Sequence, residues 1–423
     1  MRTRMSSFCT LAVLAVFMLG GPRISSAQQV VKFGEGQTLT ISGFISATMF
    51  YDHGLFGNFG QGQNAEYAAA PTGATGQPTT DKSIFDGDVR NTRINFTFNS
   101  TPVLGKWSPR ATLEADFFGT FTSAPPFGDE QPQFRVRFAF VDLSNGRTTL
   151  RIGQFWSPMF GEVPVSVTHL AFPLGYGATG MVGWRFPGVF LYQDLSAAGA
   201  PLTVQLQLAA MKGSGPPATA RDTAPTINVG NGEASGLPQF EARLNFAKKT
   251  PSLSWSAYVV GHLDWKDTTG TGRDTTNTGA QDSNMSAWGI EAGANIQPGK
   301  FTLHGNFYYG KALGQQFAHI TQHTQGHGDI RGWGAWAQAG YDFTPHWSLW
   351  AYAGMDQPDV QRFAQDNPTA GALARQLNHD YDALLRFRAG RYAVGLEYFR
   401  SVTRYNTGPA SADQVALSVL YTL

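Results

Sequence analysis

Apolar and polar residues alternate with a period of two along most of this 423-residue chain. In the run 38–52, Leu39 and Ile41 share one face, while Thr40 and Ser42 share the other. Such alternation is typical of β-strands that bury or cover one apolar face. The pattern returns repeatedly as far as the final residue, which predicts an all-β fold.

Sixteen such runs are expected to form strands, and their lengths of about ten residues match what a tilted strand needs to cross a bilayer. They are residues 38–52, 88–99, 109–118, 134–143, 148–156, 183–194, 202–211, 239–247, 252–265, 284–296, 300–311, 330–343, 347–356, 379–389, 391–404 and 412–423.

The connections between these runs alternate between short and long. The short ones contain proline, glycine and asparagine, which favour turns, at 144–147, 248–251, 297–299 and 344–346. The long ones are 53–87, 157–182, 212–238, 266–283, 312–329 and 357–378. Short periplasmic turns and long extracellular loops are typical of outer-membrane barrels, and an even strand number places both termini on the periplasmic side.

Aromatic residues near the ends of the predicted strands support a membrane barrel over a soluble β-sandwich or β-propeller, because interface girdles belong there. They are Phe50, Tyr51, Trp265, Tyr308, Tyr309, Tyr341, Phe343, Trp347, Trp350, Tyr398 and Tyr405. No run of 18 apolar residues follows the first 27 residues, so helical spans are not expected. We therefore predict a transmembrane antiparallel β-barrel of about 16 strands.

The first 27 residues have the features of a secretory signal peptide. Arg2 and Arg4 give a positive start, an apolar run follows, and Ser25–Ala27 forms a small-residue cleavage site. A retained membrane anchor is the alternative. We expect residues 1–27 to be removed, 28–37 to form a short N-terminal segment, and 38–423 to form a single barrel in the outer membrane of a Gram-negative bacterium.

The composition narrows the function classes. Charged residues make up 14% of the chain, below the ~25% of an ordinary soluble domain, while aromatic residues reach 13%. Cleavage would remove Arg2, Arg4 and Arg23 and change the formal charge from +1 to −2, which does not indicate nucleic acid as a partner. Cleavage would also remove Cys9, the one cysteine, which excludes disulfides and thiolate chemistry from the remaining chain.

A series of motifs between residues 88 and 194 carries a family resemblance. They are Asp88-Val-Arg-Asn-Thr-Arg93, Leu113-Glu-Ala-Asp-Phe-Phe-Gly119, Phe134-Arg-Val-Arg-Phe-Ala139, Gly153-Gln-Phe-Trp-Ser157, and Arg185 with Pro187 and Tyr192. In this order they resemble the DcaP-like outer-membrane porins of the general Gram-negative porin group. The resemblance implies a 16-stranded barrel, commonly a homotrimer, with a constricting third loop, and uptake of small anions, notably dicarboxylates.

Strand parity predicts a basic wall inside the barrel. If the alternate positions Ile94, Leu113, Val136, Phe138, Phe140, Leu150 and Ile152 face lipid, five arginines face the lumen. These are Arg93, Arg110, Arg135, Arg137 and Arg151. Arginine rings favour anions in pores, since the guanidinium stays charged and binds carboxylates through two hydrogen bonds. The alternative is that these arginines pair with Glu114 and Asp116 and merely hold a polar lumen together.

Two further groups of residues are candidates for the solute path. Arg386 and Arg388 alternate with Leu385 and Phe387, which fits either a second lumen patch or solvated positions at the rim.

The loop 157–182 is expected to fold inward, because it is rich in apolar residues and follows the fifth strand. Ser166, Thr168 and His169 would then line the constriction. An apolar surface at a trimer contact is the alternative for this loop.

The sequence gives little support for catalysis or cofactor binding. It has no Gly-x-Ser-x-Gly motif and no glycine-rich phosphate loop between a strand and a helix. His319, His323 and His327 recur every four residues, but the neighbouring glycines favour a solvated loop over a helical metal site. We expect no enzyme activity, no metal and no cofactor. The predicted function is passive diffusion of small, preferentially anionic solutes; the alternative is an adhesin or surface enzyme that acts through its long loops.

Overall fold

The computed structural model describes residues 29–57, 62–71, 79–119, 133–197, 199–215, 230–267, 284–316, 330–362 and 375–423. The predicted signal peptide lies outside these residues and stays a prediction. In the described part of the chain, no helix is long and apolar enough to cross a membrane.

The described strands form one closed antiparallel barrel of 16 strands, as the sequence predicted. They are β1 (Gln29–Lys32), β2 (Thr38–His53), β3 (Ser83–Asp88), β4 (Arg93–Asn99), β5 (Ser108–Asp116), β6 (Arg135–Ser144), β7 (Thr148–Trp156), β8 (Arg185–Asp194), β9 (Leu202–Met211), β10 (Gln239–Lys249), β11 (Leu253–Asp267), β12 (Asn284–Pro298), β13 (Phe301–Lys311), β14 (Arg331–Asp342), β15 (Trp347–Pro358), β16 (Arg375–Ala389), β17 (Tyr392–Tyr405) and β18 (Gly408–Thr422).

Within the described residues, three short helices lie in the connections. They are the 3-10 helix η1 (Gly62–Asn64) and the α-helices α1 (Asn231–Ala234) and α2 (Leu313–Gln316).

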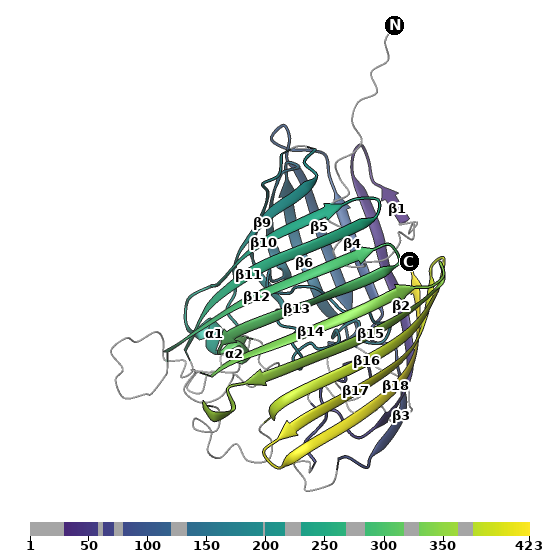
Figure 1. Ribbon diagram of the computed structural model, residues 1–423. Coiled ribbons are helices and arrows are strands. Elements are labelled where there is room, and N and C mark those ends of the chain that lie inside the picture. Colours follow the sequence, from purple (N-terminus) through teal and green to yellow (C-terminus); the bar gives the residue numbers. More distant parts are fainter. Residues whose placement is uncertain are drawn as a thin grey trace.

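From β4 to β18 each strand pairs with the next one in the chain, and the barrel closes where β18 pairs with β2, from Asp413↔His53 to Thr422↔Phe44. The strands β3 and β4 both pair with β2 and count as one interrupted barrel strand. The short strand β1 pairs with β2 beyond the end of β18 and was not predicted from the sequence. Figure 1 shows the barrel from the side, with α1 and α2 at the end that carries the long connections, called here the long-loop end.

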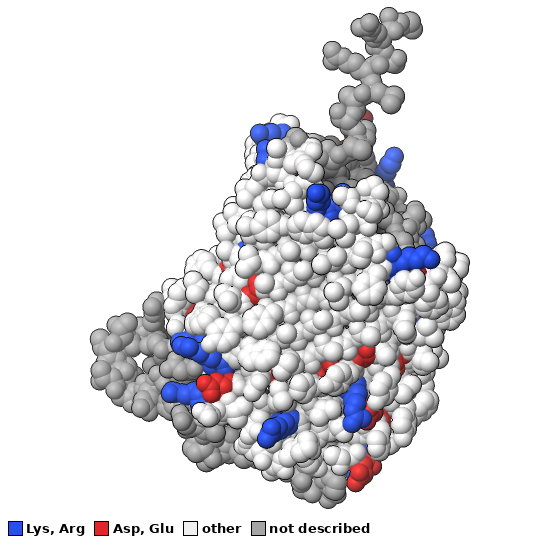
Figure 2. Space-filling view, viewed as in Figure 1, with Lys and Arg blue, Asp and Glu red and all other residues white. Residues whose placement is uncertain are grey.

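The outer wall is apolar across its middle. Side chains that point outward include the exposed Ile45, Val141, Leu263 and Leu396, while their sequence neighbours point inward and are largely polar. Figure 2 shows a face that is mostly uncharged, with lysine and arginine side chains lying toward its two ends. This distribution fits an apolar belt between two aqueous interfaces.

The aromatic residues near the strand ends divide between the two faces of the wall. Tyr51, Tyr341, Phe343, Trp347 and Tyr398 are exposed on the outside. Phe50, Tyr308, Trp350 and Tyr405 point inward and are buried. Trp265 and Tyr309 are half-buried and contact Phe240 and Trp288. The buried group therefore cannot contribute to an interface girdle.

A β-bulge in β6 corrects the predicted parity of this strand. The register passes from Glu114↔Phe138 to Ala115↔Val136, so Arg137 is an extra residue without its own partner in β5. Phe138 and Phe140 therefore point inward and are buried, and the expectation that they face lipid was wrong. A bulge places one additional residue in one strand, which inverts the alternation on one side of it.

The side chain of Gln154 on β7 stabilises this bulge. Its amide donates hydrogen bonds of 3.0 Å each to the carbonyl oxygens of Val136 and Arg137.

We expect Gln154→Leu to lower the free energy of unfolding by about 1 to 2 kcal/mol, because both bonds are lost. Denaturant titration in lipid vesicles measures this loss. Gln376→Leu is the control, since the amide of Gln376 contacts the exposed Asn406. An equal loss of unfolding free energy in both variants would contradict the conclusion that Gln154 stabilises the bulge.

Candidate functional site

Six arginines from five neighbouring strands lie together on the inner wall, among three carboxylates. This arginine cluster consists of Arg93 on β4, Arg110 on β5, Arg135 and Arg137 on β6, Arg151 on β7 and Arg185 on β8, with the carboxylates Glu114, Asp116 and Asp142. Strand parity predicted that five of these arginines point inward, and it made no prediction for Arg185.

Asp116 and Glu114 hold the centre of the arginine cluster. Arg135 donates to the two carboxylate oxygens of Asp116 at 2.9 and 2.7 Å. Arg137 bridges the acids, donating to Asp116 at 2.8 Å and to Glu114 at 2.8 Å. Arg93 lies 3.7 Å from Glu114 and donates to the carbonyl oxygen of Leu170 at 3.1 Å. The bulge at Arg137 gives the chain an extra inward-pointing cation at this place.

Asp142 holds the other pair of arginines. Arg151 donates to it at 2.7 and 3.0 Å, and Arg110 donates to the same carboxylate. The guanidinium of Arg151 lies 3.8 Å from the ring centroids of both Phe140 and Phe155. Arg151 is therefore held by a carboxylate and two aromatic faces at once, which fixes its position.

Side-chain exposure separates the arginines into two groups. The side chains of Arg110, Arg135 and Arg93 are 32%, 20% and 14% exposed. Arg137 and Arg151 are 2% exposed. The first three can meet a solute in the lumen, whereas the buried ones act on the wall itself.

Arg185 belongs with the buried arginines. Its guanidinium packs over the rings of Trp156 and Trp184, with centroid distances of 4.7 and 4.3 Å. With six guanidinium groups and three carboxylates, the cluster carries an excess of three positive charges. The arginines therefore pair with carboxylates, and the wall still keeps a net positive charge.

Arg386 and Arg388 lie on β16, apart from the cluster in sequence and in their contacts. Arg386 is buried, lies over the ring of Trp350, and donates to the hydroxyl of Ser348 at 3.3 Å. Arg388 lies 3.7 Å from Asp342, close to the turn between β14 and β15. Arg386 thus faces the interior, and Arg388 lies near the rim.

The loop 157–182 crosses the interior and contacts the wall opposite the cluster. The N–H of Met159 donates to Glu241 on β10 at 2.7 Å. Farther along, Gln338 on β14 accepts from the N–H of Val165 at 2.7 Å and donates to its carbonyl at 2.8 Å. A single glutamine thus pairs with both backbone groups of one loop residue.

The next part of the loop is held by β17 and by the segment before β4. Glu397 accepts hydrogen bonds from the N–H groups of Val167 and Thr168 at 3.2 and 3.0 Å. Asn91 donates to the carbonyl of Thr168 at 2.5 Å and accepts from the N–H of Ala171 at 3.0 Å.

On its way back the loop passes β14 and β16. Thr179 donates to Asp380 at 3.0 Å. Gly180 has a φ of +87°, and a Cβ there would lie 2.5 Å from the backbone nitrogen of Ala335. The loop therefore approaches the strand so closely that glycine is required at this position.

The three predicted constriction residues are buried between loop and wall. The hydroxyl of Ser166 accepts from the N–H groups of Thr168 and His169 at 3.0 and 2.7 Å, and Thr168 shares a 2.8 Å hydrogen bond with Ser418. Burial lowers the pKa of His169, so its imidazole adds no charge at neutral pH. These residues anchor the loop, while the half-buried positions in this segment are 161–163, 165 and 170.

The wall opposite the cluster carries inward carboxylates that the sequence reasoning did not single out. They are Glu241, Glu291, Asp356, Asp380, Asp382 and Glu397. Loop N–H groups or hydroxyls cover several of them: Tyr258 donates to Glu291, and Tyr308 donates to Asp356 at 2.5 Å. The alternation of these strands indicates that the carboxylates point inward. It does not indicate that they are covered, because the donors that cover them come from elsewhere in the chain.

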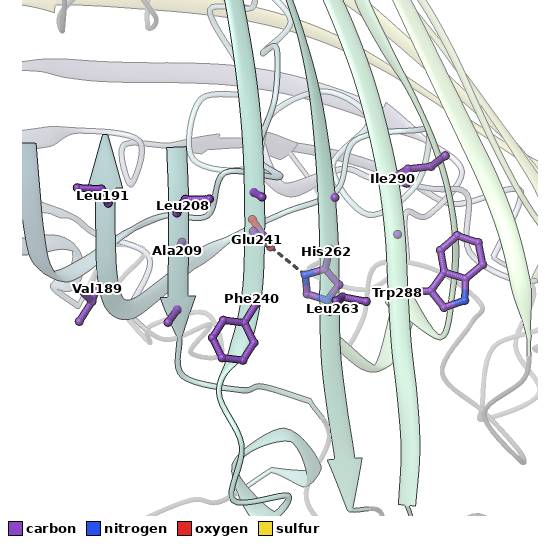
Figure 3. Close-up of a pocket in the computed structure, with 14 residues that line it drawn as sticks. Val189, Leu191, Leu208, Ala209, Phe240, Glu241, His262, Leu263, Trp288 and Ile290 are labelled. Carbon is purple, nitrogen blue, oxygen red and sulfur yellow. Dashed lines mark hydrogen bonds and ion pairs between the residues drawn. The ribbon is translucent and has the colours of Figure 1, made fainter. Parts of the chain in front are cut away.

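A groove of about 730 Å³ lies on the outer face of β8–β12 and is separate from the lumen. Figure 3 shows Phe240, Leu263 and Ile290 around it, and these side chains are exposed. Behind the groove, the buried His262 and Glu241 form a 3.0 Å hydrogen bond on the inner side of the wall. The groove therefore belongs to the apolar outer surface and not to the solute path.

In the part of the chain that the structure describes, no group of three histidine, cysteine, aspartate or glutamate residues is placed to hold a metal ion. His319, His323 and His327 lie outside the described residues.

Comparison with known proteins relates the chain to outer-membrane channels of solved structure. It is similar to the outer membrane channel DcaP of Acinetobacter baumannii, with a TM-score of 0.65 and 18% identity over 93% of this chain and 99% of that chain. Pseudomonas putida OprB gives a TM-score of 0.53 at 11% identity, covering 90% and 94%. Salmonella typhi OmpF gives 0.52 at 12% identity, covering 93% and 100%.

No protein-family model and no curated protein sequence matches the chain. The resemblance to the DcaP-like porins is confirmed by the solved structures at the level of the fold.

Proposed function

We propose that this chain, which has the fold of the DcaP channel, is an outer-membrane porin that lets small hydrophilic solutes diffuse passively and prefers anions, in particular dicarboxylates. The observation that carries the proposal is the contrast between the two walls. Arg93, Arg110 and Arg135 remain partly exposed, while several of the acids opposite accept hydrogen bonds from the loop 157–182 or from tyrosines, namely Glu241, Glu397, Glu291 and Asp356.

The contrast matters because a charge on the inner wall attracts or repels a solute more weakly when hydrogen-bond donors or opposite charges already stabilise it. The N–H groups that point at Glu241 and Glu397 already stabilise those negative charges. The arginine cluster keeps an excess of positive charge, and low-dielectric walls strengthen its field in the lumen. An anion near the cluster is therefore favoured over a cation.

The spacing of the exposed arginines suits a solute with two carboxylates. Arg93 lies on β4 and Arg135 on β6, so two strand spacings, about 10 Å, separate their backbones. Guanidinium groups bind carboxylates through paired hydrogen bonds. A dicarboxylate can then contact two arginines while it passes, without any tight site that would retain it.

Two long connections favour a channel over an adhesin or surface enzyme. Residues 157–182 and the described residues of 54–71 dock on the inner wall, where they restrict the lumen instead of offering a surface to a partner. Cleavage of residues 1–27 and assembly as a homotrimer remain part of the proposal and rest on the sequence and on the family resemblance.

Planar-bilayer recording of the purified full chain tests this function. We expect discrete conductance steps, and in a KCl gradient a reversal potential of the sign that chloride preference gives. Millimolar dicarboxylate should reduce the KCl current more than a neutral sugar does, because it occupies the arginine cluster. Absence of steps would reject the channel, and a cation-selective reversal potential would reject the anion preference.

A further inference from the structure

The first long connection follows β2, and its described residues 54–57 and 62–71 dock on the inner wall of the barrel. Gln63, Asn64 and Ala68 are buried, with at most 1% of their surface exposed. The N–H of Gly62 donates to Asp52 at 3.1 Å, and Gln414 donates to the carbonyl of Gly62 at 2.9 Å. The sequence analysis did not predict this inward course, although the segment contains apolar residues such as Leu55 and Phe56.

A second anchor holds this segment against β16 and β17. The N–H of Ala68 donates to the hydroxyl of Ser401 at 3.1 Å, and Tyr405 donates to the carbonyl of Ala68 at 2.6 Å. The guanidinium of Arg375 lies 3.7 Å from the ring centroid of Tyr67. Both backbone groups of Ala68 are thus fixed by side chains of one strand.

The segment is also connected to the loop 157–182 by a chain of buried hydroxyl and amide groups. Gln63 donates to Thr48 at 2.6 Å, Thr48 and Ser418 share a 2.7 Å hydrogen bond, and Ser418 and Thr168 share one of 2.8 Å. Hydrogen bonds in such a chain polarise and strengthen one another. Displacement of one loop therefore weakens the attachment of the other.

Aromatic rings make the same connection a second time. The ring of Phe399 on β17 stacks on Phe56 of the first connection at 5.7 Å and contacts His169 of the loop 157–182 at 5.2 Å. Two independent contacts thus join the two inward segments at one part of the wall.

We propose that the described residues 54–57 and 62–71 form a second constriction layer, which braces the loop 157–182 and sets the upper size of solute that the lumen admits. The layer occupies the side of β2 and β16–β18, while the arginine cluster lies on β4–β8, so the solute path is confined to the basic side. This inference rests on the proposed porin function and adds a specificity element to it.

An excision variant tests the proposal directly. The N–H of Gly54 donates to the carbonyl of Lys82 at 2.7 Å, and His53 is paired with Ser83, so β2 and β3 already form a hairpin at this point. Residues 55–81 can then be replaced by an Asn-Gly turn, which suits a two-residue hairpin. We expect single-channel conductance to rise about twofold and larger polyethylene glycols to enter, since pore width governs both.

A second variant leaves the chain length unchanged. Thr48→Val combined with Ser418→Ala removes the hydroxyl chain between the segments, and we expect a larger conductance with more frequent fluctuations of the open current. The matched control is Thr97→Val combined with Thr112→Ala, which removes a hydroxyl contact of 3.4 Å between neighbouring strands on the basic side.

The outcomes separate the two proposals. If the wild-type chain gives no conductance steps, the porin function fails. If the wild type conducts but both variants keep its conductance and its polymer exclusion limit, the second constriction layer is refuted while the porin function stands. The second constriction layer would also be refuted if the conductance of the control variant at Thr97 and Thr112 changed as much as that of the variant at Thr48 and Ser418.

Discussion

A channel in which Arg93, Arg110 and Arg135 are all replaced by glutamine is expected to lose its preference for anions. The replacement removes three positive charges from the cluster, which then holds three arginines and three carboxylates and has no net charge. Because these three side chains are the partly exposed ones, the field that a passing ion meets changes most. We expect the ratio of chloride to potassium permeability to fall to about 1.

The triple variant should still fold, because each carboxylate keeps a buried partner. Arg137 continues to bind Glu114 and Asp116 at 2.8 Å, and Arg151 continues to bind Asp142 at 2.7 Å. The loss of the exposed arginines removes additional hydrogen bonds but leaves no carboxylate without a cation. A selectivity change can thus be measured without general unfolding.

Reversal potentials in a KCl gradient measure the effect, and a second triple variant controls for total charge. Arg147 and Arg404 are also exposed and the side chain of Arg400 is 43% exposed, but these residues lie at a turn or point away from the lumen. Their replacement by glutamine removes the same formal charge and should leave the reversal potential near that of the wild type. An unchanged potential in the cluster variant, or an equal shift in both, would reject the basic wall as the source of selectivity.

The second large effect is expected at Asp116, where Asp116→Asn should lower the free energy of unfolding by about 3 to 5 kcal/mol. Asp116 is fully buried and accepts hydrogen bonds from Arg135, from Arg137 and from the N–H of Phe118 at 3.2 Å. Asparagine has nearly the same shape but no charge. Arg137, which is itself buried, then keeps Glu114 alone as its anion.

Denaturant titration of the barrel in lipid vesicles measures this loss. Asp86→Asn is the control, because Asp86 is exposed and accepts a hydrogen bond from the adjacent N–H of Gly87. A double-mutant cycle with Arg137→Met should show a coupling of about 1 to 3 kcal/mol, since the two residues share one network. Equal stability of the Asp116 and Asp86 variants would show that the network contributes little.

The strand pattern was predictable because alternation, turn residues and the lengths of the connections all follow from one requirement, a wall with lipid on one side and polar groups on the other. The exceptions are local. The parity of Phe138 and Phe140 was wrong because the extra residue Arg137 shifts one strand against its partner. A bulge of this kind leaves no distinct signature in a single sequence.

The candidate site was predictable as a set of inward arginines but not as a network. Exposure separates Arg135 from Arg137, and it depends on which rings and carboxylates surround each guanidinium. The inward course of the loop 157–182 was expected from its apolar residues. The inward course of the first connection was not predicted: it contains the buried Phe56, but it also docks through the backbone of Gly62 and Ala68 and the amide of Gln63, whose partners lie on distant strands.

The closure of the barrel between β18 and β2 has a consequence for how the chain reaches its final state. Thr48 and Ser418 are 370 positions apart, yet they form a hydrogen bond across the seam. Until the last strand has been delivered, β2 and the most recently formed strand are open edges that can pair with other chains. Contacts of such long sequence separation also form slowly. The pairing of the fifteen-residue strand β18 with β2 therefore removes the two open edges at once.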